Sequence, residues 1–115
     1  MKVSRKRFEE LVVEALDGLP DWVVERMENV EIMVIDEPPP GEPGLLGRYE
    51  GIPLTRRGAG YAGVLPDRIM LFRSTIQRVS PNEDALRQRV RQTVVHEIAH
   101  FFGISDDRLR EIDRY

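Results

Sequence analysis

Residues 80–106 read SPNEDALRQRVRQTVVHEIAHFFGISD, and no other stretch of this chain carries so many structural signals. Ser80 fits the N-cap of a helix, and Pro81 fits the first helical position, where its missing N–H costs nothing. Glu83 lies three residues after Ser80, at the position from which the glutamate side chain of a capping box accepts a hydrogen bond from the backbone N–H of the N-cap residue. The stretch therefore predicts a helix that begins at about Pro81.

The same helix is expected to end at about Phe102. Gly103 follows, and glycine readily takes the left-handed conformation that closes a helix. A short last helix opened by Ser105 or Asp106 is expected after this turn. The apolar residues near the end of the long helix are expected to be core, namely Val94, Val95, Ile98, Ala99, Phe101 and Phe102.

His96-Glu97-Ile98-Ala99-His100 lies inside this helix and contains both histidines of the chain. Four residues make about one helical turn, so both imidazoles lie on one face and can chelate a single metal ion. Glu97 lies about 100° around the helix axis, close to the same region without being a ligand. It is placed to act as general base on a water held by the metal.

A catalytic zinc site needs a third protein ligand and an open position for water. No histidine remains, so an acidic residue has to supply it. Asp106 follows His100 by six residues, after the helix break at Gly103, and is the candidate that the spacing favours. Asp107, Glu111 and Asp113 are the competing candidates. Asp107 fits better in the first turn of the last helix, where negative charge is favoured.

The first third of the chain predicts two helices and a strand. Ser4 can cap a helix whose core face is Phe8, Leu11, Val12, Ala15 and Leu16, and which ends at Gly18 and Pro20. Asp21 can cap a short helix from Trp22 to about Glu28, with Trp22, Val23 and Met27 as core residues. Residues 30–35, rich in β-branched side chains, predict a strand that the prolines at 38–40 terminate.

The middle of the chain is rich in glycine and proline. Residues 38–63 contain five of the eight prolines and seven of the nine glycines. A loop of this length is uncommon in a small domain unless it flanks a cleft, and a plain mobile loop is the alternative. A short strand is expected over residues 49–54 and another over 68–72, and residues 73–79 are compatible with a turn or a short helix. Tyr49 and Tyr61 are taken as packing or loop residues.

Composition excludes several classes of protein. The 115 residues have the size of one domain, and we treat residues 1–115 as such. There is no cysteine, so neither a disulfide scaffold nor a Cys-ligated zinc finger is possible. No apolar run approaches the ~20 residues that span a bilayer, and no signal peptide is evident. The net charge of −3 argues against nucleic-acid binding, and Arg87 and Arg91, with Arg89 between them, are interpreted as a solvated face of the long helix. We expect a cytoplasmic monomer.

Read as a whole, HEIAHFFGISD has the form HExxHxxGxxD, which resembles the motif of zincin metallopeptidases of metzincin type with aspartate at the third ligand position. The chain is similar to a family of minimal zincin-like bacterial proteins, also in residues 45–51 (LLGRYEG) and 65–69 (LPDRI). The Met-containing turn of metzincins is missing, since only nine residues follow Asp106 and none is methionine.

The resemblance implies that His96, His100 and Asp106 bind zinc and that Glu97 is the catalytic base. It implies an α+β fold in which a small mixed sheet packs against an N-terminal helix and the long zinc-binding helix. It also implies a strand edge beside the metal that could hold an extended peptide.

Three functions remain open. The first is zinc-dependent hydrolysis of peptide bonds in a peptide or protein substrate. The second is a metal-dependent endoribonuclease, although the related pattern HGxLHxxGxDH lacks the glutamate that Glu97 provides here. The third is a non-catalytic domain in which zinc is structural or the protein binds a partner. Nitrogen and oxygen ligands accept several divalent ions, of which zinc is preferred here.

Overall fold

A computed structural model describes the chain over residues 1–61 and 65–108. Within this part the helices are α1 (Arg5–Asp17), α2 (Asp21–Arg26), α3 (Arg73–Arg78) and α4 (Glu83–Phe101), with two single-turn 3-10 helices, η1 (Leu54–Arg56) and η2 (Ala59–Tyr61). The strands are β1 (Val30–Ile35), β2 (Gly47–Glu50) and β3 (Asp67–Phe72). The predicted ambiguity over residues 73–79 is resolved as a helix.

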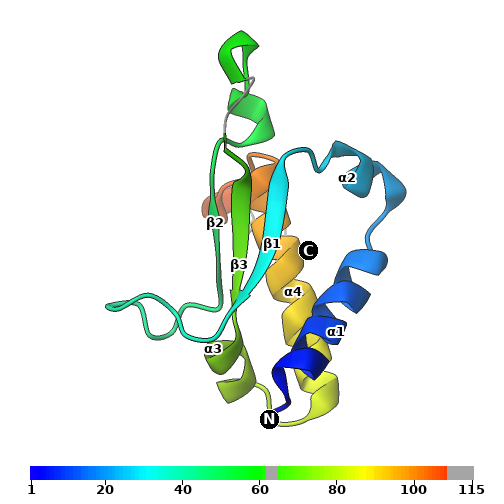
Figure 1. The fold of residues 1–115 in the computed structure, drawn as a ribbon, viewed down its shortest axis with the longest axis vertical. Helices are drawn as coiled ribbons and strands as arrows, with labels where there is room; N and C mark the ends of the chain where they lie inside the picture. The colour runs from blue at the N-terminus through cyan, green and yellow to red at the C-terminus, as the bar shows by residue number, and fades with distance from the viewer. Residues whose placement is uncertain (62–64, 109–115) are drawn as a thin grey trace.

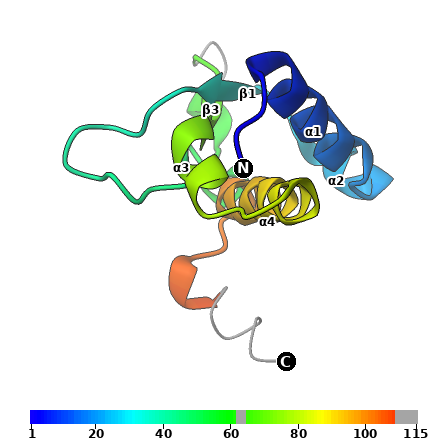
Figure 2. The same cartoon turned by 90° about the horizontal axis from the view of Figure 1, so that it is seen from below.

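The three strands form one small mixed sheet in the order β1-β3-β2. β1 runs parallel to β3, with Ile32 opposite Ile69, and β2 runs antiparallel to β3, with Tyr49 opposite Ile69. The long helix α4 lies behind the sheet with α1 beside it (Figures 1 and 2). The expected α+β fold, a small mixed sheet against an N-terminal and a long C-terminal helix, is confirmed.

The core lies between the sheet and the two long helices. The predicted inner face of α1 is confirmed, since Phe8, Leu11, Val12 and Ala15 are buried and Ser4 caps the helix by accepting a hydrogen bond from the Arg7 N–H. From α4 and the sheet come Leu86, Val90, Val94, Ile98, Ile69 and Leu71. Val95, which we expected in the core, is 47% exposed because it lies on another side of α4 from Val94 and Ile98.

The start of α4 differs from the prediction. Asn82, not Ser80, is the N-cap, and its side chain accepts a hydrogen bond of 2.9 Å from the Ala85 N–H. The Ser80 hydroxyl instead donates to the Ile76 carbonyl at the end of α3. Two polar residues suited to capping stand close together here, and the packing of α3 decides between them. The helix ends at Phe101, with Phe102 as the C-cap.

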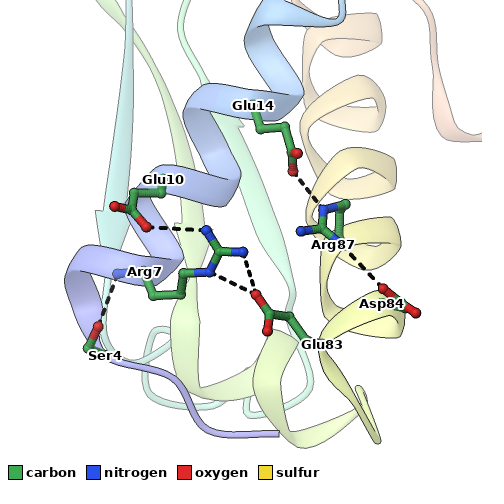
Figure 3. A network of polar contacts seen from close by, with 7 residues as sticks. All are labelled: Ser4, Arg7, Glu10, Glu14, Glu83, Asp84 and Arg87. Atoms are coloured by element: carbon green, nitrogen blue, oxygen red, sulfur yellow. Dashed lines mark hydrogen bonds and ion pairs between the residues drawn. The ribbon is translucent and has the colours of Figure 1, made fainter.

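Glu83 is not a capping-box residue, because its carboxylate contacts the guanidinium of Arg7 on α1, with Nε at 2.8 Å from the oxygen (Figure 3). Arg7 also contacts Glu10 on its own helix. One turn further along, Arg87 of α4 contacts Glu14 of α1 at 2.8 Å. These partly exposed ion pairs join α1 to the helix that carries both histidines.

Two further predictions are wrong in detail. Trp22 is 56% exposed rather than in the core, because the six-residue helix α2 buries only Val23. The indole ring of Trp22 instead lies edge-on to the ring of Phe102. Asp21 is not the N-cap of α2 but its first residue, and its side chain makes no capping hydrogen bond; Pro20 occupies the cap position. The helix ends at Arg26 rather than at about Glu28.

The strand predicted over residues 49–54 lies at Gly47–Glu50, so it begins two residues and ends four residues earlier than predicted. Gly51 ends it with a φ of +150°. At this position a Cβ atom would fall 2.1 Å from the carboxyl carbon of Asp67, so the chain can turn here only as glycine.

No helix in the described part of the chain combines the length and the apolar character that a membrane crossing requires.

Candidate metal centre

His96 and His100 lie one turn apart near the end of α4, as the spacing predicts. Their ring centroids are 4.8 Å apart and the rings are nearly perpendicular, at 83°. The side chain of His96 is 44% exposed and that of His100 is 22% exposed, so both reach the surface of the protein.

The turn after α4 brings Asp106 back to the two histidines. Gly103 adopts a φ of +88°, as predicted, and its N–H donates to the His100 carbonyl at 2.9 Å. The Ile104 N–H donates to the Ala99 carbonyl, which completes a Schellman motif. Ser105 then accepts a hydrogen bond from the Arg108 N–H, and a new helical turn starts at Asp106.

Three potential ligand atoms converge at this point. Asp106 Oδ1 lies 3.1 Å from His96 Nε2 and 3.0 Å from His100 Nε2, and the two nitrogens are 3.2 Å apart. Ligands at about 2.0 Å from a tetrahedral zinc ion are about 3.3 Å from one another. The triangle therefore fits a small divalent cation, and two nitrogens with one carboxylate oxygen form a donor set that suits zinc.

The hydrogen bonding of His100 fixes which nitrogen faces this point. Its Nδ1 lies 2.8 Å from the carbonyl oxygen of Ile104, and a carbonyl can only accept, so Nδ1 carries the proton. In the neutral ring, Nε2 then has a free lone pair directed at His96 and Asp106. A second partner that orients a histidine in this way also raises its basicity as a ligand.

Glu97 is buried between α4 and β2, in contrast to the three ligand candidates, which reach the surface. It is 6% exposed, and its carboxylate accepts a hydrogen bond from the backbone N–H of Tyr49. Burial raises its pKa, while the nearby His96 and His100 act in the opposite direction. A carboxylate with these neighbours is suited to accept a proton close to the histidines.

β2 approaches α4 closely because residue 47 is glycine. A Cβ atom on Gly47 would lie 2.7 Å from Thr93 Cγ2 and 3.3 Å from Glu97 Cγ. Leu46 and Phe72 form a hydrogen-bonded pair, so the antiparallel alternation directs the N–H and C=O groups of Gly47 and Tyr49 away from β3. Tyr49 uses its N–H for Glu97, and Gly47 presents its backbone groups at the edge of the sheet.

A cleft of about 780 Å³ opens beside this edge. Residues 44–47 form one wall and α4 forms the other, with His96 and Glu97 at one end. Residues 44–47 of the glycine-rich loop thus flank a cleft, which is one of the two alternatives that the sequence left open for this loop.

Sequence reasoning missed a buried polar cluster behind the site, formed by Tyr49, Arg57 and Asp67. The side chains of Asp67 and Arg57 are 1% and 8% exposed and form an ion pair of 2.8 Å. The Tyr49 hydroxyl donates to the same carboxylate, and burial together with this hydrogen bond raises the pKa of Tyr49. Asp67 belongs to the segment LPDRI that carried part of the resemblance, which was the one available signal.

Arg57 fixes the loop that braces the turn after α4. Its guanidinium donates to the carbonyls of Ile52 and Glu28, and it lies over the rings of Tyr61 and Phe101, 4.3 and 4.9 Å from their centroids. Thr55, two residues before Arg57, lies against Gly103, so closely that no Cβ would fit between them. This part of the glycine- and proline-rich loop thus contacts the turn that positions Asp106.

Of the other acidic candidates, Asp107 lies in the helical turn that starts at Asp106 and is not among the three groups that converge. Glu111 and Asp113 lie outside the described residues.

A helix with two histidines one turn apart, a buried glutamate between them and an aspartate returned by a glycine turn is the arrangement expected of a zincin-type metal centre. The sequence profile of the zincin-like metallopeptidase family matches residues 27–115, and the chain belongs to this family. No curated protein matches the chain. Among solved structures, a conserved hypothetical protein from Thermo thermophilus is 24% identical, with a TM-score of 0.57 over 84% of this chain and 92% of that one. This similarity concerns the fold.

Proposed function

We propose that this protein hydrolyses peptide bonds with a zinc ion held by His96, His100 and Asp106. The observation that carries the proposal is the convergence of these three ligand atoms, at 3.0–3.2 Å from one another, next to a buried carboxylate that is not one of them. Membership in the zincin-like metallopeptidase family supports the same reaction class.

Zinc in such a site supplies Lewis acidity to the scissile carbonyl and lowers the pKa of a water molecule toward ~7. The protein supplies the proton acceptor. Glu97 accepts a proton from the attacking water and passes it to the leaving amine, so that the carboxylate is regenerated at the end of the cycle. The Tyr49 N–H holds this carboxylate in place during both transfers.

The edge of β2 is suited to hold the substrate. An extended peptide can add to a free strand edge by main-chain hydrogen bonds, and the outward N–H and C=O of Gly47 are placed for this next to Glu97. We therefore propose that a peptide or protein substrate binds in the cleft between residues 44–47 and α4. That the protein is a cytoplasmic monomer without nucleic-acid partners remains a proposal from composition alone.

The test compares the variants Glu97→Gln, Asp106→Asn and Asp107→Asn with the wild type, each purified and loaded with zinc. We expect Glu97→Gln to retain one zinc per chain by elemental analysis and to lose hydrolysis of casein and of a quenched peptide library. Asp106→Asn should lose zinc, and Asp107→Asn should behave as wild type.

Structured RNA is included as a substrate, because RNA cleavage without peptide cleavage would overturn the proposal in favour of a nuclease. Stoichiometric zinc without hydrolysis of either substrate would assign the metal a structural role. Unchanged peptide turnover in Glu97→Gln would remove the proposed base.

A further inference from the structure

The cleft extends along α4 well beyond the candidate metal centre. Arg89, Gln92, Thr93 and His96 line it at positions i, i+3, i+4 and i+7, so they form one continuous face of the helix. The opposite wall is apolar and consists of Leu45 and Leu46 between two glycines. The cleft therefore has the metal centre at one end and a cationic side chain at the other.

Arg89 has no acidic partner in the described part of the chain, and it lies in the cleft rather than on the solvated face where we expected it with Arg87 and Arg91. Its neighbour Arg87, by contrast, is paired with Glu14 and Asp84. No described residue forms an ion pair or a side-chain hydrogen bond with the guanidinium of Arg89, although the residue is half-buried. Among the described residues, the one acidic side chain that lines the cleft is that of Glu97, at the far end. An unpaired guanidinium in a partly enclosed cleft favours a carboxylate ligand.

We infer that Arg89 determines specificity by binding a carboxylate of the peptide substrate, about three residues from the scissile bond. The inference rests on the proposed function for the position of that bond. Arg89 and His96 are seven positions apart on the helix, which is about 10 Å along the axis, and an extended peptide covers this distance in about three residues. Leu45, Leu46 and Val95 provide apolar contacts for the residues in between.

The experiment uses zinc-loaded full-length protein and fluorescein-labelled octapeptides in which a single Glu is moved along an otherwise uncharged sequence. Matched peptides carry Gln or Lys at the same position, and each is made with a free and with an amidated C-terminus. Hydrolysis is measured with wild type, and binding is measured by fluorescence anisotropy in the Glu97→Gln protein.

The variants are Arg89→Gln and Arg89→Glu, and Arg91→Gln is the matched control. Arg91 is an exposed arginine two residues further along α4, about 200° around the axis, and it does not line the cleft. We expect wild type to prefer the Glu peptide over the Gln peptide on the order of tenfold, the difference that one charge-assisted hydrogen bond supplies. Arg89→Gln should abolish the preference, Arg89→Glu should shift it to Lys, and Arg91→Gln should leave it intact.

A Glu preference that persists in the amidated peptides would assign the carboxylate to an acidic side chain. An affinity that falls on amidation equally for the Glu and the Gln peptide, and only while Arg89 is present, would assign it to the substrate's C-terminus. Acid-dependent binding without hydrolysis would overturn the proposed reaction but support the role of Arg89. The inference itself is wrong if wild type distinguishes neither the Glu from the Gln peptide nor the free from the amidated C-terminus, or if both Arg89 variants keep the wild-type preference.

Discussion

Gly103 ends α4 in the left-handed region, with Thr55 packed directly against its α-carbon. An alanine here would adopt the same φ of +88° at a cost of about 1–2 kcal/mol. Its Cβ would also fall 2.4 Å from Thr55 Oγ1, so one of the two segments has to move. We expect Gly103→Ala to lower the free energy of unfolding by at least this amount and to weaken zinc binding, measured by urea denaturation and zinc titration.

The control for this prediction is Gly58→Ala, because a Cβ at Gly58 meets no atom within 4 Å. The double variant Gly103→Ala with Thr55→Ala separates the two causes, since it removes the overlap with Oγ1 but not the backbone strain. Equal stability of Gly103→Ala and Gly58→Ala would contradict the assigned role of Gly103.

Tyr49 predicts a specific dependence of stability on alkaline pH. Burial and the hydrogen bond to Asp67 raise the pKa of its hydroxyl in the folded protein above that of an unfolded chain, near 10. Above about pH 10 the unfolded chain therefore releases a proton that the folded protein keeps. The contribution of the Tyr49 hydroxyl to the free energy of unfolding is therefore fully present below about pH 10 and is lost as the pH rises further.

We expect the free energy of unfolding to fall with pH above about 10, and to fall less steeply in Tyr49→Phe. The measurement is urea denaturation at a series of pH values from about 8 to about 11 for both proteins. Other ionisable groups contribute equally to both curves, so the difference in slope isolates Tyr49. Parallel curves would show that the hydroxyl is not held protonated by the fold.

At the scale of elements, the loop between β2 and β3 depends on the buried pair of Arg57 and Asp67. Removing one partner of such a pair leaves the other charge buried and uncompensated, at a cost of about 3–5 kcal/mol. We expect Arg57→Met to lose stability of this order, measured by thermal and urea denaturation. It should also weaken zinc binding, because Thr55 then no longer braces Gly103.

Arg56→Met is the matched control, since Arg56 is an exposed neighbour in the same loop. If the two variants were equally stable, the pair would be dispensable. If Arg57→Met lost stability but bound zinc as wild type does, the loop would not position Asp106.

Helices and strands were predictable where local signals agree. Ser4 with the apolar face of α1, the strand at Val30–Ile35 and the glycine stop at residue 103 each depend on neighbours in the sequence. The start of α4 could not be predicted, because Ser80 and Asn82 are both suitable N-cap residues. Only the hydrogen bond of the Ser80 hydroxyl to α3 excludes Ser80 as the cap. Trp22 likewise remained exposed because α2 is too short to bury it.

The candidate ligands could be predicted because a motif within eleven residues fixes their geometry. His96 and His100 are one turn apart in any α-helix, and the Schellman turn at Gly103 determines the return of Asp106. Arg57, Asp67 and Arg89 could not be predicted. Their roles depend on which segments the fold brings together, and a buried ion pair between a loop residue and the first residue of a strand has no periodic signature in a sequence.

On the scale of the whole molecule, one helix serves both the core and the candidate metal centre. Leu86, Val90, Val94 and Ile98 of α4 pack against α1 and the sheet, while His96 and His100 project from the same turns to the surface. A metal ion that joins these histidines to Asp106 would therefore fasten the segment after Gly103 to the main core. Ligand binding to the folded state alone stabilises it in proportion to ln(1 + [L]/Kd).

We accordingly expect zinc to raise the free energy of unfolding by about 2.7 kcal/mol when free zinc is about 100 times Kd. For a chain of this size the shift in Tm is on the order of 10 °C, measured by scanning calorimetry with zinc and after removal of metal by a chelator. The variant His96→Ala should show no such shift, because two of the three ligands alone bind weakly. A Tm that zinc raises equally in wild type and His96→Ala would place the bound metal elsewhere on the molecule.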